Sequence, residues 1–259
     1  MNNEFAIAGV VIKELYRRKD FYVLFVLTAL ISIILGSMKF FNDDRIVRYL
    51  KDACLMLIWI SSLIIAITTA ARQIPAERES RTIFPLLAKP VSRAQLIVGK
   101  FLGCWLACGL TLLVFYFFFG AITASREHDW PVAVYLQAAW LHWICLGIVV
   151  ALVLLGSVVF TAPSSNATIS AIVVLGIMFC ARHLNGVAVH MGGISGAIVY
   201  LIYYCIPHLE WFDVRDFVVH SWGMVNWGIC GEATIYGLLY CGFLLGATWL
   251  VFRRKTLTV

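Results

Sequence analysis

Charged residues are scarce in this chain of 259 residues. They make up 13% of the sequence, against about 25% in an average soluble domain. Hydrophobic residues reach 62%, and the mean hydropathy is +0.90. So little charge over so much apolar sequence excludes a disordered tail, a secreted disulfide scaffold and a soluble nucleic-acid-binding protein. The composition predicts an integral membrane protein, so the formal net charge of +6 is interpreted by its placement along the chain.

Ionisable residues are nearly missing from the interior of the apolar runs. His142, with Gln137 near it, is the one candidate deep within a run, and the other five histidines fall in more polar segments. Membrane enzymes and ion-coupled carriers place charged groups inside their spans, because a buried charge is costly and is retained where it acts. We therefore expect no catalytic residue. His142 is interpreted as a hydrogen-bonding residue between helices, with a ligand role as the alternative.

Metal and nucleotide motifs are lacking as well. Of the eight cysteines, Cys104 and Cys108 share a helix face, but no His or carboxylate joins them, so all eight are expected to pack against neighbouring helices. Gly99-Lys100 is similar to the end of a phosphate-binding loop, yet Phe101 follows where Ser or Thr is needed. The sequence predicts no bound cofactor, no metal site and no ATPase activity of its own.

Apolar runs long enough to cross a bilayer are abundant. A spanning helix needs about 20 apolar residues, and the sequence predicts an all-α polytopic protein with six spans, at 21–41, 53–71, 96–124, 132–160, 167–183 and 233–252. The fifth run is short, and glycine-rich sequence and a second short apolar run follow it. We expect one crossing there, with 184–232 as an outer re-entrant or interfacial segment. Two full crossings are the alternative.

The few charges indicate an orientation. With six spans and both termini in the cytoplasm, 13 of the 20 basic residues and five of the 14 acidic residues lie inside, in agreement with the positive-inside rule. A seventh crossing would place the basic cluster 253–255 outside. Residues 1–20 carry Phe5, Ala8, Ile12 and Leu15 at helical spacing, which predicts an interfacial helix. A basic flank that only orients the first span is the alternative.

The long cytoplasmic loop 72–95 has two helix-start signals. Pro75 suits the first turn of a short helix to about Ile83, and Glu77 and Glu79 complement its N-terminal dipole. Ser92 and Gln95 form a capping box, which predicts that the third span begins at Arg93. The result is a compact helical knuckle between two spans, although the same charges also fit a solvated loop.

Three stretches in and after this loop form a pattern: AERE with RT at 76–79 and 81–82, LLAKPVSR at 86–93, and GKFLG at 99–103. A fourth, YYCIPHLEWFD at 203–213, lies in the outer segment. With the span count and the N-terminal helix, the chain resembles the transmembrane subunits of type-2 ABC transporters, the permeases, and is most similar to their NosY-like branch.

The resemblance implies a permease that pairs with a second copy or a sister permease and rests its loop helix in a cleft of a separate ABC ATPase subunit. ATP and Mg²⁺ would belong to that partner. The residues implied in the ATPase contact are Glu77, Arg78, Glu79, Arg81 and Thr82. The hinge between the loop and the third span comprises Pro90, Ser92, Arg93, Gly99 and Lys100.

The predicted function is that of a permease subunit of an ATP-driven exporter in the bacterial cytoplasmic membrane. An ion-coupled secondary transporter is one alternative, although it would need an internal repeat and a charged group at mid-membrane. A haem or quinone oxidoreductase is a second, and paired intramembrane histidines would have supported it.

Overall fold

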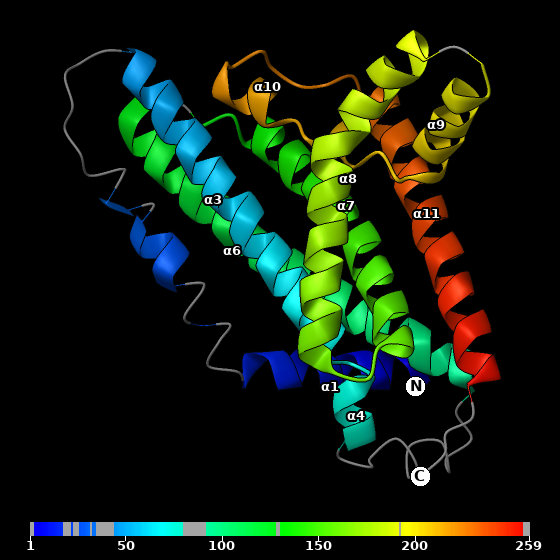
Figure 1. Ribbon diagram of the computed structural model, residues 1–259. Helices are drawn as coiled ribbons and strands as arrows, with labels where there is room; N and C mark the ends of the chain where they lie inside the picture. The colour runs from blue at the N-terminus through cyan, green and yellow to red at the C-terminus, as the bar shows by residue number, and fades with distance from the viewer. Residues whose placement is uncertain are drawn as a thin grey trace.

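The computed structural model describes residues 3–17, 22, 26–31, 33–34, 44–79, 92–127, 130–191 and 193–255. Within these ranges every regular element is helical (Figure 1). The elements are α1 (Asn3–Tyr16), α3 (Asp44–Ala71), α4 (Pro75–Glu79), α6 (Arg93–Glu127), α7 (Val132–Val159), α8 (Pro163–His190), α9 (Gly193–Cys205), η1 (Leu209–Phe212), α10 (Arg215–Val219) and α11 (Trp227–Arg254). An all-α fold is confirmed for the described residues.

Four of the described helices are long and apolar enough to cross a membrane. They run over Val47–Glu79, Arg93–Ser125, Val132–Val159 and Trp227–Arg254. The predicted span 167–183 lies inside α8, of which a shorter part, Pro163–Phe179, is apolar. The predicted span 21–41 falls largely outside the described residues. The count of six spans therefore stays a prediction.

Helix α7 forms the centre of the bundle. It packs against α3, α6, α8 and α11, and most of its residues from Tyr135 to Val158 are buried. Trp105 of α6 and Trp143 of α7 each donate an indole N–H to the other's backbone carbonyl, at 2.9 and 2.8 Å. Lipid tails give apolar helices no hydrophobic reason to associate, so such hydrogen bonds and close packing hold the pair together.

His142 joins two helices in this core, as predicted. Its side chain is buried, its Nε2 lies 2.9 Å from Ser62 Oγ of α3, and its ring stacks on Trp59 with centroids 4.1 Å apart. The Ser62 hydroxyl gives Nε2 a hydrogen-bond partner without water, and the Trp59 indole covers one face of the imidazole ring. The interpretation of His142 as a helix–helix hydrogen-bonding residue is confirmed.

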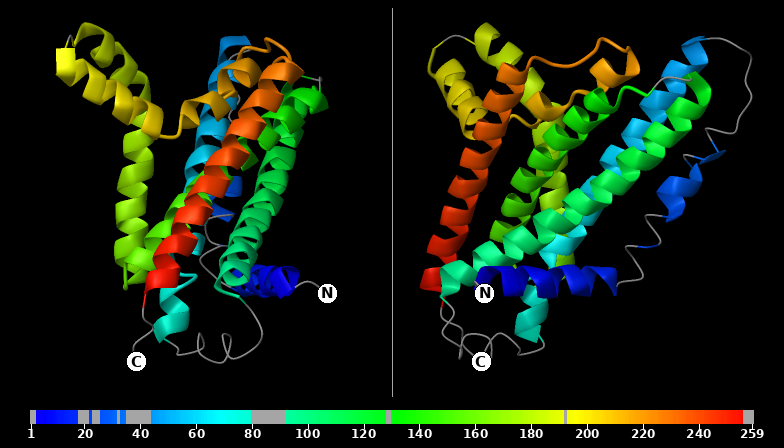
Figure 2. Two further views of the ribbon diagram at one scale, coloured as in Figure 1. Left: turned by 90° about the vertical axis from the view of Figure 1, so that its right-hand side faces the viewer. Right: turned by 180° about the vertical axis from the view of Figure 1, so that it is seen from behind.

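Helix α1 crosses the end of the bundle at a steep angle to the long helices (Figure 2). It packs on α6 through two glycines: a Cβ added to Gly99 would lie 2.9 Å from the Cβ of Ile7, and one added to Gly103 would lie 2.7 Å from the Cβ of Val11. The absence of side chains at these two positions lets α1 approach α6 closely.

The opposite end carries the segment between α8 and α11 (Figure 1). Helix α8 continues to His190, beyond the predicted end of its span at 183, because a single glycine such as Gly186 weakens a helix without ending it. The turn into α9 comes at Gly193, with a φ of +75°. Gln137 of α7 then fixes the return to α11, donating to the backbone oxygen of Val225 at 2.9 Å and accepting from its N–H at 2.8 Å.

Candidate functional site

Helix α4 is the short element that projects from the α1 end of the bundle (Figure 1). The chain leaves α3 at Ala71, turns through 72–74 and enters α4 at Pro75, as predicted. Ile74 is 1% exposed and packs in a small cluster with Leu96 of α6 and Phe252 of α11. The described part of α4 ends at Glu79, and the predicted continuation to Ile83 lies outside the described residues. A buried apolar residue thus anchors α4 just before its first turn.

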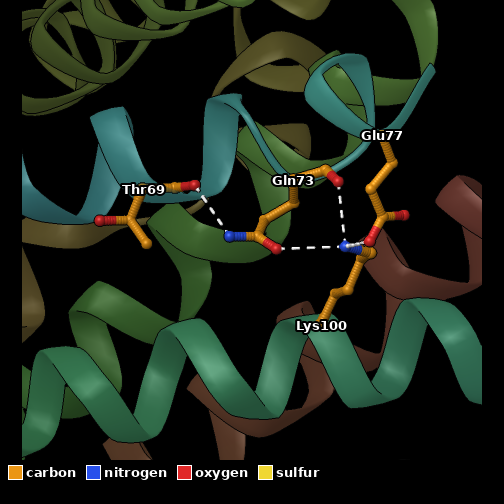
Figure 3. A network of polar contacts seen from close by, with 4 residues as sticks. All are labelled: Thr69, Gln73, Glu77 and Lys100. Carbon is orange, nitrogen blue, oxygen red and sulfur yellow. Dashed lines mark hydrogen bonds and ion pairs between the residues drawn. The ribbon is translucent and has the colours of Figure 1, made fainter. Parts of the chain in front are cut away.

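A buried lysine ties α4 to α6 (Figure 3). Lys100 is 3% exposed, and its Nζ lies 2.7 Å from Glu77 Oε1, 3.0 Å from the backbone oxygen of Gln73 and 3.2 Å from Gln73 Oε1. Gln73 Nε2 in turn donates to the backbone oxygen of Thr69 at 3.3 Å. An ammonium group has three donors, and here each has an acceptor. A buried charge in such a setting holds its surroundings in one geometry, since losing any acceptor is costly.

The predicted ATPase-contact residues fall into different environments. Glu77 faces the bundle through its bond to Lys100, whereas Glu79 is exposed and Arg78 is half-buried. Glu77 Oε2 and the Nε and Nη2 atoms of Arg78 are buried, and none has a hydrogen-bond partner among the residues that the structure describes. Arg81 and Thr82 lie outside the described ranges. The described part of α4 therefore presents Glu79 outward and directs Glu77 inward.

The capping box at the start of α6 is confirmed. The backbone N–H of Ser92 donates to Gln95 Oε1 at 3.0 Å, and the N–H of Gln95 donates to Ser92 Oγ at 3.2 Å. Helix α6 begins at Arg93, as predicted. Reciprocal bonds of this kind satisfy donors that the first turn leaves unpaired. They fix where the chain becomes helical after the loop.

The remaining hinge residues lie in or near this helix start. Arg93 is in the first turn of α6, and its Nη1 donates to the backbone oxygen of Phe252 at 2.7 Å, at the end of α11. Gly99 and Lys100 lie within the uninterrupted helix and face different neighbours, α1 and α4. Pro90 is outside the described residues. Sequence reasoning missed the contact of Arg93 with α11, because any residue supplies a backbone carbonyl and no pattern marks the acceptor.

No group of three or more His, Cys, Asp or Glu side chains in the described ranges could hold a metal ion. The site consists of a short projecting helix, an ion pair that secures it, and a long apolar helix behind it. Together with the long apolar helices of the bundle, these features are typical of a polytopic membrane domain.

The family of the chain follows from comparison with known proteins. The model of the ABC-2 family transporter protein matches residues 7–196, which is more than two thirds of the chain and includes α4 and its loop. The chain belongs to the ABC-2 transporter family. It is a multi-pass membrane protein and a transmembrane subunit of an ABC transporter, a class that associates with an ABC ATPase subunit. No curated protein is significantly similar to it.

Proposed function

We propose that the chain is the permease subunit of an ATP-driven exporter of the NosY-like branch, coupled to a separate ATPase through α4. It works with a second copy or a sister permease in the bacterial cytoplasmic membrane, with both termini in the cytoplasm. ATP and Mg²⁺ are held by the ATPase. The observation that carries the proposal is the fastening of α4: a projecting helix secured from behind by the Lys100–Glu77 ion pair.

Rigidity is what the ion pair contributes. Helix α4 has five described residues. A helix of that length is not stable on its own, because forming the first turn loses more conformational entropy than its single hydrogen bond offsets. Pro75 is buried, Ile74 is packed and Glu77 is bonded to Lys100. A push on α4 therefore displaces α3 and α6 with it and does not merely unwind the short helix.

The proposed ATPase contact uses the outward side of α4. Glu79 is exposed and Arg78 is half-buried, and Arg81 and Thr82 complete the contact by resemblance. Glu77 contributes to this contact indirectly. Its Oε1 bonds Lys100 at 2.7 Å, and this bond fixes the orientation of α4 and so the direction in which Arg78 and Glu79 point. ATP binding draws two ATPase subunits together, α4 follows as a lever, and the paired permeases switch between inward-facing and outward-facing arrangements.

Co-purification from the native membrane tests the proposal. Tagged wild-type chain should recover an ABC ATPase with ATPase activity. Glu79→Arg should lower the recovered ATPase about fivefold or more, since reversing a contact charge costs more than 1 kcal/mol. Asp216→Arg, on the exposed side of α10, is the matched control and should leave recovery unchanged. Absence of any ATPase from the wild-type preparation, or equal recovery with both variants, would contradict the proposal.

A further inference from the structure

A second set of polar contacts joins three helix ends beside α4. The guanidinium of Arg93 lies at the C-terminal end of α11, where its Nη1 is 2.7, 3.2 and 3.4 Å from the backbone oxygens of Phe252, Arg253 and Lys255. Its guanidinium carbon also lies 5.3 Å from the centroid of the Phe252 ring. The last carbonyls of a helix have no partner within the helix, and a cation there also meets the negative end of the helix dipole. Arg93 thus fastens the start of α6 to the end of α11.

Lys255 repeats the contact one helix further on. Its Nζ donates to the backbone oxygens of Val158 and Val159, at 2.7 and 3.1 Å, at the C-terminal end of α7. Its own backbone oxygen is one of the acceptors near Arg93. Lys255 therefore takes part in two helix caps: its backbone oxygen is near Arg93, which caps α11, and its ammonium group caps α7. The two caps connect α6, α11 and α7 in series.

Lys255 lies close enough to α4 to interact with the charge of Arg78. The pKa of Lys255 is lowered from its ordinary value, first by loss of water around the ammonium group and then by the positive charge of Arg78 on α4. Val158 and Phe252, which flank the two caps, share one buried cluster with Ile74 and Leu96. The caps and the anchor of α4 are thus parts of one packed region.

We infer that Arg93 and Lys255 are positioning residues for transport: they fasten the cytoplasmic ends of α6, α11 and α7 into one unit, so that displacement of α4 by the ATPase moves all three helices together. This inference rests on the proposed function. The ion pair of Lys100 passes motion from α4 to α6, Arg93 passes it to α11, and Lys255 passes it to α7. Helix α7 carries this motion into the centre of the bundle, where it also packs against α3 and α8.

Matched variants in the complex of the chain with its co-purified ATPase test the inference by ATPase activity. Arg93→Gln and Lys255→Gln each remove one cap. Arg254→Gln removes the same charge from an exposed neighbour and is the control. A broken link in a series should lower the activity about fivefold or more, as a typical coupling between sites does. The conservative variants Arg93→Lys and Lys255→Arg should restore activity, which a loss of packing would not allow.

The double variant separates a series from two independent supports. If the caps act in series, Arg93→Gln with Lys255→Gln should be no less active than either single variant. Independent contributions would instead multiply to about 25-fold. That product, or single variants as active as Arg254→Gln, would overturn the inference. So would failure of both single variants to assemble while Arg254→Gln assembles, since the caps would then be structural only. A wild-type preparation without ATPase would instead defeat the proposed function.

Discussion

Lys100 and Glu77 differ in burial, and this difference decides which substitution is more damaging. The side chain of Lys100 is 4% exposed and that of Glu77 is 22% exposed. Glu77→Gln should therefore lower the free energy of unfolding by about 3 kcal/mol, because it leaves a buried ammonium without a counter-charge. Lys100→Met should cost about 1 kcal/mol, because the carboxylate can turn toward water. Denaturation of the purified protein in detergent measures both changes.

The double variant is the control for this pair. Glu77→Gln with Lys100→Met removes both charges, so its loss should be smaller than the sum of the two single losses. Additive losses would show that the ion pair does not couple α4 to α6. A larger loss for Lys100→Met than for Glu77→Gln would show that burial does not set the order.

His208 gives the outer segment a predicted pH dependence. It is 5% exposed, its ring lies 4.4 Å from that of Tyr203 in α9 and 6.3 Å from that of Tyr236 in α11, and its Nδ1 is 4.0 Å from Glu210 Oε1. Burial lowers the pKa of His208, and the carboxylate of Glu210 opposes that shift only in part. The folded protein therefore binds the proton less readily than the unfolded chain does.

The sign of the effect follows from linkage. As the pH falls through about 6.5, the ordinary histidine value, the unfolded chain takes up a proton that the folded protein refuses, so stability falls. The melting temperature should drop more between pH 7.5 and 5.5 for the wild type than for His208→Gln, whose side chain does not titrate. Carboxylates contribute equally to both proteins. An equal drop in the two would show that His208 titrates normally.

Helix α1 depends on the absence of side chains at two positions of α6. A Cβ on Gly103 would lie 2.7 Å from the Cβ of Val11 and 3.0 Å from the backbone oxygen of Ala8, so Gly103→Ala should push α1 away and lower the melting temperature. Gly9→Ala is the matched control within α1, where an added Cβ meets nothing within 4 Å. It should stabilise the helix by about 0.5–1 kcal/mol. Proteolysis of α1 and the melting temperature measure both outcomes, and equal behaviour of the two variants would contradict this packing.

The elements that the sequence predicted well are those with a local cause. The capping box fixed the start of α6 at Arg93, Pro75 began α4, and long apolar runs predicted the helices that contain them. The contacts that it missed join distant parts of the chain. Arg93 meets α11 across 159 residues through a backbone carbonyl, which leaves no mark in the sequence. The sequence places Lys100 in the hinge but does not indicate its partner, because its bond to Glu77 depends on the path of the turn between α3 and α4.

At the scale of the whole molecule, the ends of the bundle differ in composition. Helices α1 and α4 and the end of α11 lie at one end, and α9 and α10 lie at the other (Figure 1; Figure 2). The first end carries the basic side chains of Lys13, Arg72, Arg93 and Arg254. The other carries Asp213, which pairs with Arg215 at 2.8 Å, and Asp216, with exposed tryptophans such as Trp222 that suit a membrane interface. The asymmetry supports a cytoplasmic position for α1, α4 and the end of α11.

Labelling with a membrane-impermeant maleimide tests that topology. In a Cys205→Ser background, which removes the thiol that is exposed among the cysteines whose side chains the structure describes, Lys13→Cys, Glu79→Cys and Arg254→Cys should react in inverted membrane vesicles and not in intact cells. Asp216→Cys should show the opposite pattern, because residue 216 follows five of the six predicted spans and therefore lies on the outer side, whereas all six spans return both ends of the chain to one side. Reaction of Lys13→Cys and Arg254→Cys from opposite sides would require an odd number of spans. It would therefore refute the six-span arrangement and favour a second crossing between α8 and α11.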